Sequence, residues 1–325
     1  MYFLTPPLVD FALQRFDHIE LAEGDRFFST FGPGNLINAT NKPHERFNDY
    51  EELLQLLRKR NRQKYEQVHK GTPFFFLSWL AFDLRNFEKA LYYLDAAISE
   101  DVKNAGGNWV NLPGSQFLRL TEQEHVAGRI ILRIRELLDD EINRFNQISA
   151  LPPITLADFI DKFVSILIQN PQTRTIVSAF YIFLLEKTER LIELKLRSTE
   201  GSSLGPIISH LFGGGLIFES LLKNRYPTKD DGNPVKVLGN VFHTTPFRND
   251  FSPGVQTSAE SLQEILDAIN DNSFITAFTV TARLRNTTGH NLVWDNIFNT
   301  SANYETLCQQ IVNALLYVIE RKFIR

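Results

Sequence analysis

Apolar residues recur at helical spacing over most of this 325-residue chain, from about residue 49 to its end. In the stretch 49–70, Leu53, Leu54 and Leu57 repeat between charged residues, which is typical of an amphipathic helix. Alternating, strand-like stretches are few, and residues 1–48 are expected to be loop-rich. The fold class is therefore predicted to be mainly α. Further helices are expected over 121–150, from Thr155, over 175–197, over 207–223, after 257–260 and from Asn303.

A double proline at 152–153 is the best candidate for a domain boundary, because proline cannot donate the helical hydrogen bond and restricts the residue before it. We expect a helical N-terminal domain over 1–150 and a helical C-terminal domain over 151–325. Thr155 to Asp158 has the pattern of a helix N-terminus. Residues 227–256 are polar and rich in proline and glycine, so they are predicted to form a surface loop inserted into the second domain.

One helical hairpin is expected at 74–101. Its small residues would let two helices approach, and its aromatic residues would fill the gap, at the spacing that a tetratricopeptide repeat uses. The residues at this spacing are Phe74, Leu77, Ser78, Ala81, Phe87, Ala90, Leu94 and Ala97. No clear second copy is visible. The hairpin is either an ordinary part of the N-terminal core or a single repeat that binds peptides.

Composition excludes several classes of site. Cys308 is the only cysteine, so neither a disulfide framework nor a cysteine-based metal site is possible, and the histidines lack partners at ligand spacing. No metal and no cofactor are expected. No run of 18 apolar residues and no secretory signal appear, so no membrane span and a cytoplasmic location are predicted. The three glycines at 213–215 lack the lysine of a phosphate-binding loop and are read as a flexible turn or a close helix contact.

The sharpest motif is RLRNTTGH at 283–290, in which Arg285 and Asn286 are followed by three small residues and His290. This R-x4-H form resembles the signature of the HEPN superfamily, a helical domain common in RNA-cleaving toxins and antiviral proteins. LIFESLLK at 216–223 resembles the opening helix of these domains. The resemblance covers about residues 206–325, and it implies a HEPN-like helical bundle in the C-terminal domain.

The resemblance implies a metal-independent endoribonuclease. Histidine suits the proton transfers of RNA cleavage near neutral pH, so His290 is expected to act as general acid and base. Arg285 would stabilise the charge that gathers on the phosphate oxygens, and Asn286 would bind phosphate or orient the histidine. The two functional side chains can converge only if the helix loosens between them, and Thr287, Thr288 and Gly289 favour such a loosening.

In the family the motifs of two chains face each other, so the resemblance implies a homodimer with a composite site that cleaves RNA. It also suggests a toxin or an antiviral defence effector, with a possible regulatory protein partner. The alternative is a non-catalytic scaffold that uses a HEPN-like domain for dimerisation. In that case Arg285 would only form a salt bridge or cap a helix, and His290 would be an ordinary helix-end residue.

Other basic residues could contact RNA. Arg283 precedes the motif, and five cations stand together in one run, namely Arg58, Lys59, Arg60, Arg62 and Lys64. Such a run could supply sequence-independent phosphate contacts, a nuclear-import signal or only a solvated helix end. A second arginine–histidine pair, Arg62 and His69, has the looser form R-x6-H and lies inside the expected helix 49–70. The net charge of −4 argues against a broad nucleic-acid coat, whereas five basic and three acidic residues from Asn272 onward allow a small RNA-cleaving cleft.

Overall fold

The computed structural model describes residues 6–30, 43–122, 125–196, 204–258, 261–289 and 301–325. Two compact units divide the chain, residues 1–132 and residues 133–325. The division falls within helix α9 (His125–Ile148), whereas the sequence suggested a boundary at the prolines after that helix. Within the described ranges there is no strand, only one isolated antiparallel bridge between Thr228 and Pro234, so the fold is mainly α.

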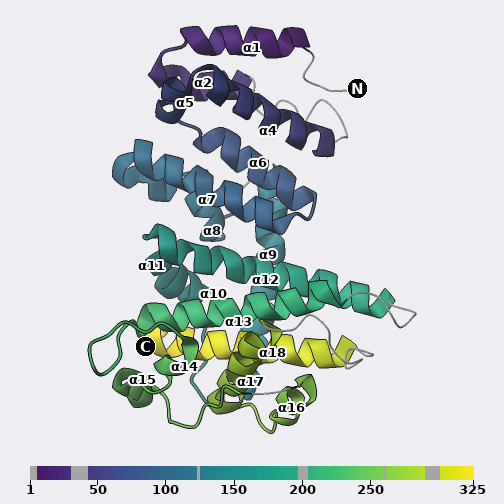
Figure 1. Cartoon of the computed structure of the whole chain (residues 1–325), viewed down its shortest axis with the longest axis vertical. Coiled ribbons are helices and arrows are strands. Elements are labelled where there is room, and N and C mark those ends of the chain that lie inside the picture. Colours follow the sequence, from purple (N-terminus) through teal and green to yellow (C-terminus); the bar gives the residue numbers. More distant parts are fainter. Residues whose placement is uncertain (1–5, 31–42, 123–124, 197–203, 259–260, 290–300) are drawn as a thin grey trace. The chain divides into compact units, whose positions relative to one another are not determined.

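The first unit is built from helices (Figure 1). They are α1 (Pro6–His18), α2 (Gly24–Thr30), α4 (Pro43–Arg60), α5 (Arg62–Gln67), α6 (Gly71–Asp83), α7 (Phe87–Asn104) and α8 (Pro113–Leu118), with 3-10 turns at Leu21–Glu23 and Gly106–Asn111. Buried phenylalanines stabilise its N-terminal part, where the rings of Phe16 and Phe27 lie 5.4 Å apart. The expectation of a loop-rich start is therefore corrected for residues 6–30, since α1 and α2 occupy most of them.

The helix expected over 49–70 is interrupted. Asn61 stands between α4 and α5 in a non-helical conformation, and its side chain accepts a hydrogen bond from the backbone N–H of Lys64 at 3.1 Å. An asparagine in this position caps a new helix start, which local apolar spacing does not reveal. His69 consequently lies between α5 and α6 and not inside a helix.

The expected hairpin is present as α6 and α7. Ser78, Ala81, Ala90, Leu94 and Ala97 are all buried along it, as the repeat-like spacing predicts. The small side chains bring the two helices close together, and aromatic rings fill the space beside them. The ring centroids of Phe74 on α6 and Tyr93 on α7 lie 5.9 Å apart.

The second unit contains the C-terminal part of α9 and the remaining helices. These are α10 (Leu156–Asp158), α11 (Ser165–Leu167), α12 (Pro171–Leu196), α13 (Gly205–Arg225), α14 (Leu238–Val241), α15 (Thr245–Asp250), α16 (Leu262–Asp267), α17 (Phe274–Thr288) and α18 (Ser301–Ile319), with π-helical turns at Phe159–Val164 and Glu320–Ile324. In Figure 1, α12, α13, α17 and α18 pack against one another as the core of this unit.

Helix α18 lies at the centre of that core. Every residue from Leu307 to Ile319 except Gln309 is buried, so the helix is covered on all sides and not only on the predicted apolar stripe. Cys308 is among these residues, and burial raises the pKa of its thiol to about 12. The thiol therefore stays protonated, as expected for an unreactive core cysteine.

The three glycines at 213–215 lie inside α13, where Gly214 and Gly215 mark close helix contacts and not a flexible turn. A Cβ atom on Gly214 would stand 2.5 Å from the Phe183 ring, and one on Gly215 would stand 2.6 Å from Cβ of Arg285. Among the helices of the described residues, α13 alone has the length and apolar composition of a membrane span, and most of that stretch is buried against neighbouring helices.

The segment 227–256 was expected to be a surface loop, but part of it is helical and buried. It contains α14 and α15, and it buries Leu238, Val241 and Phe247. The Phe247 and Phe278 rings lie 6.1 Å apart, so the segment contributes to the core beside α17. The polar and proline-rich composition concealed these isolated apolar anchors, because they have neither a helical nor a strand period over any useful length.

Thr155 begins the helical stretch after the double proline, as predicted. Its hydroxyl accepts from the Asp158 backbone N–H at 3.0 Å, and the Asp158 carboxylate accepts from the Thr155 backbone N–H at 3.3 Å. Replacing Thr155 by alanine should lower the free energy of unfolding by about 1 kcal/mol, because the helix loses one end of this reciprocal cap. Chemical denaturation measures the change, and an unaltered midpoint and slope would contradict it.

Candidate functional site

The RLRNTTGH motif begins in α17 and extends past its end. The helix ends at Thr288, and Gly289 forms its C-cap with φ and ψ still in the right-handed helical region. His290 lies outside the described residues. The loosening predicted at Thr287 and Thr288 is not present, because both residues are still part of α17 despite their poor helix propensity.

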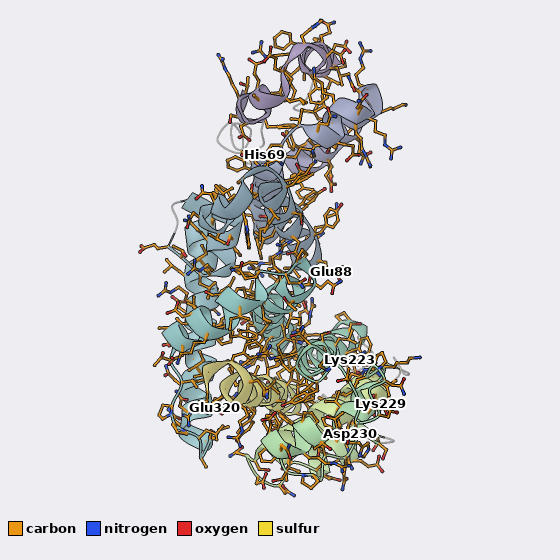
Figure 2. All side chains as sticks on the ribbon, turned by 90° about the vertical axis from the view of Figure 1, so that its left-hand side faces the viewer. His69, Glu88, Lys223, Lys229, Asp230 and Glu320 are labelled. Carbon is orange, nitrogen blue, oxygen red and sulfur yellow. The ribbon has the colours of Figure 1, made fainter. Side chains whose placement is uncertain are left out.

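Arg285 is held by a buried carboxylate on another helix. Its Nε donates to Oε2 of Glu219 on α13 at 2.5 Å. The side chain of Glu219 is 7% exposed and that of Arg285 is 29% exposed. Lys223, labelled in Figure 2, approaches the other oxygen of Glu219 at 3.3 Å. The ion pair therefore fixes the Nε side of the guanidinium, and the Arg285 side chain as a whole stays partly exposed.

Asn286 extends the same network. Its side-chain oxygen accepts from Nη1 of Arg285 at 3.2 Å, and its amide donates to the carbonyl of Thr257 at 2.8 Å. Arg285 thus uses Nε and one N–H of Nη1 in the bonds to Glu219 and Asn286. A guanidinium has five N–H donors, so three are not used by these two bonds.

Glycines allow this close arrangement. A Cβ atom on Gly215 would stand 2.9 Å from Cα of Arg285, so only glycine permits α13 and α17 to approach at that level. A Cβ atom on Gly289 would stand 2.9 Å from the ring of Phe212, again on α13. The backbone of α17 therefore lies against α13 at Arg285, and Gly289 at the end of α17 also lies against α13. This packing places the guanidinium beside Glu219.

Arg283 does not join Arg285. It bonds to the side-chain oxygen of Gln256 and, at 3.4 Å, to the carbonyl of Glu264. Two residues along a helix separate side chains by about 200°, so Arg283 faces α16 while Arg285 faces α13. As an RNA-binding residue, Arg283 stays a prediction that the local geometry does not favour.

The basic run of the first unit is partly neutralised. Arg58 pairs with Glu66 at 2.8 Å, Arg60 pairs with Asp17 at 2.9 Å, and Lys64 donates to the Asp17 carbonyl at 2.7 Å. Lys59 and Arg62 are exposed. The run spans the break between α4 and α5, so its cations do not follow one continuous helix. Its role in RNA binding stays a prediction, supported chiefly by the two exposed cations.

A second cluster of ionisable groups was not predicted. His69 bonds through Nδ1 to Oδ1 of Asp25 on α2 and through Nε2 to Oδ1 of Asp101 on α7, both at 2.9 Å. In Figure 2 its label stands where the chain passes from α5 to α6. The bonds to Asp101 and Asp25 raise the pKa of His69 to about 9, so the ring is a cation at neutral pH. The arginine–histidine spacing drew attention to His69, but its carboxylate partners lie 32 and 44 residues away.

This cluster should make the stability of the first unit depend on pH. The folded pKa of His69 lies above the value of about 6.5 in an unfolded chain, so the contribution is complete below pH 6.5 and disappears as the pH rises through 9. We expect the free energy of unfolding to fall by about 1–3 kcal/mol across this window, after allowing for the exposure of Asp25. Denaturation at pH 6 and pH 9.5 measures the difference. His69→Ala should abolish most of it, and an equal slope in both proteins would disprove the assignment.

The described residues hold no group of three or more His, Cys, Asp and Glu side chains placed to bind a metal ion. His210 is a core histidine, whose Nε2 donates to the Phe183 carbonyl at 2.9 Å and whose Nδ1 accepts from the Tyr304 hydroxyl at 2.7 Å. Burial lowers its pKa to about 4, so it is neutral. Comparison with protein-family models, curated proteins and solved structures finds no match to this chain.

Proposed function

We propose that the chain is a metal-independent endoribonuclease of the HEPN type, with Arg285, Asn286 and His290 in its active site. The observation that carries the proposal is the pairing of Arg285 with the buried Glu219, at the end of a helix and five residues ahead of a histidine. A buried carboxylate orients the guanidinium before substrate arrives, so little reorganisation is needed when negative charge develops on the phosphate.

In the proposed reaction His290 takes the proton of a ribose 2′-hydroxyl, which attacks the adjacent phosphorus, and a proton is delivered to the leaving 5′-oxygen. Arg285 binds the equatorial oxygens of the transition state through donors that Glu219 and Asn286 do not use. The products carry a 2′,3′-cyclic phosphate and a 5′-hydroxyl. Glu219 acts as a positioning residue, since its oxygens contact Arg285 and Lys223.

The proposal includes a homodimer in which two motifs form one composite site on RNA. In this scheme residues 1–132 regulate the nuclease or recruit a protein partner, and the biological role is that of a cytoplasmic toxin or antiviral effector. The support is the motif and its resemblance to HEPN domains, together with the helical packing of α13, α17 and α18 around Arg285.

The test compares wild type with His290→Ala on a labelled RNA in the presence of EDTA. We expect cleavage by wild type to persist in EDTA, to yield cyclic-phosphate ends, and to be lost in the variant. Equal cleavage by both proteins would overturn the site. Absence of cleavage by wild type over a panel of structured and single-stranded RNAs would favour the non-catalytic scaffold, in which the Arg285–Glu219 pair only joins two helices.

A further inference from the structure

The first unit contains a cavity of about 840 Å³ beside His69. It is lined by residues of α2, α6, α7 and α8, by the 3-10 turn Leu21–Glu23 and by residues of the adjoining connections. This volume is in the range of pockets that hold small organic ligands. All of its lining residues belong to the first unit, so the cavity is separate from the nuclease site proposed above.

Aromatic side chains of α6 form one wall. The ring of Trp79 contacts Phe75 at 5.0 Å and Phe76 at 4.9 Å between centroids, both edge to face. These contacts hold the three rings in one cluster on successive turns of a helix. The wall therefore offers a broad apolar surface, and the negative faces of such rings attract cations.

The charged lining of the cavity is acidic. Asp25, Asp101 and Glu122 supply three carboxylates and His69 supplies one positive charge at neutral pH, and the lining residues that the structure describes include no lysine or arginine. The lining therefore carries a net charge of −2. The bonds to His69 use Oδ1 of both aspartates, which leaves Oδ2 of each carboxylate outside those two bonds. Asp25 is largely accessible, with 64% of its side chain exposed.

The acidic end of the cavity is rigidly built. A Cβ atom on Gly71 would stand 2.3 Å from Oδ1 of Asp101 and 2.6 Å from Nε2 of His69, so the start of α6 is packed directly against the charged cluster. His69 has both ring nitrogens engaged by carboxylates, and it is therefore not placed to exchange a proton with a ligand. The cluster is arranged for binding and not for proton transfer.

From this combination we infer that the cavity binds an organic cation, an ammonium or guanidinium group on a hydrocarbon body. The carboxylates face the charge and the α6 aromatic wall contacts the body. Phosphorylated ligands are disfavoured, because two net negative charges at the cavity repel them. The cation can come from a free amine or from a lysine or arginine side chain of a peptide, and the chemistry recognised is the same.

Isothermal titration calorimetry on the full chain with three probes of one shape tests the charge requirement. Phenethylamine is cationic, 2-phenylethanol is neutral and phenylacetate is anionic at pH 7. We expect affinity to fall in that order, with at least a tenfold preference for the cation, and to weaken as salt increases. Equal affinity for all three probes, tighter binding of the anion, or no binding of the amine up to about 10 mM would overturn the inference.

Three variants test whether the cation binds in this cavity, and a peptide probe tests whether the cation comes from a free amine or from a peptide side chain. Asp25→Asn and Glu122→Gln should each weaken phenethylamine binding several-fold, whereas Glu88→Gln should leave it unchanged. Glu88 is an exposed carboxylate on α7 that does not line the cavity, and it is labelled in Figure 2. An acetyl-Gly-Arg-Gly-amide peptide that binds more tightly than phenethylamine, and loses affinity when citrulline replaces arginine, indicates a peptide source. Tighter binding of phenethylamine than of the peptide indicates a free amine. If Asp25→Asn, Glu122→Gln and Glu88→Gln all weaken phenethylamine binding equally, the ligand does not bind in this cavity.

Discussion

Replacing Arg285 by alanine should reduce kcat for RNA cleavage by about 100- to 1,000-fold, the effect of removing one preorganised donor from a developing oxyanion. The guanidinium is anchored to a carboxylate that is 7% exposed, so its orientation is set within the folded protein itself. Arg285→Lys keeps the charge but removes the planar fork, and it should recover only a small part of the rate. Single-turnover cleavage of a labelled RNA separates this loss from weakened binding.

Two further variants define the role of the ion pair. Arg248→Ala removes an exposed arginine of α15 and should retain the wild-type rate, which controls for a general loss of positive charge. Glu219→Gln keeps an oxygen acceptor but removes the negative charge, and we expect a loss of about tenfold in kcat with a smaller change in KM. If Arg285→Ala folds normally, as shown by circular dichroism, and cleaves RNA as fast as wild type, Arg285 is only a structural residue.

Replacing Gly215 by alanine should destabilise the second unit by about 1–3 kcal/mol, as expected for an overpacked helix contact. The new methyl group would meet Cβ of Arg285 at 2.6 Å and its Cα at 2.9 Å, and a backbone atom cannot move aside as a flexible side chain can. Helices α13 and α17 would have to separate, which would also displace Arg285 from Glu219. We expect a lower thermal midpoint and, if the proposed function holds, slower RNA cleavage.

Gly213 supplies the matched control in the same helix. A Cβ atom at Gly213 has nothing within 4 Å, and alanine is a better helix former than glycine. Gly213→Ala should therefore stabilise the protein by up to about 1 kcal/mol. A thermal midpoint that falls equally in both variants would show that the α13–α17 contact does not depend on the absence of a side chain at Gly215.

Several local features were predictable because their causes lie within a few residues. The helix start at Thr155 depends on Asp158, three residues away. The loosening predicted from the poor helix formers Thr287 and Thr288 does not occur, since α17 continues through both. The break at Asn61 also has a local cause, a cap on the N–H of Lys64, but the apolar spacing continues across it and concealed it. Helical class and most helix positions in 121–225 were therefore predicted, while some ends were not.

The segment 227–256 was misjudged for a different reason. Its apolar residues are isolated, and Phe247 and Phe251 become core residues only because α17 presents Phe278 to them, with ring centroids 6.1 and 5.0 Å away. No local pattern distinguishes such an anchor from a phenylalanine in a loop. Burial of these rings depends on segments about 30 residues apart along the chain meeting in space.

The sequence by itself determined the mainly α class, the amphipathic helices, the hairpin of α6 and α7, and the succession of Arg285, Asn286 and position 290. Helix propensity, capping and apolar periodicity act between residues within about four positions, so they can be read along the chain. Only the tertiary structure decided that Glu219 holds Arg285 and that Asp25 and Asp101 hold His69. Those carboxylates are distant in sequence, and they meet their partners because packed helices bring them there.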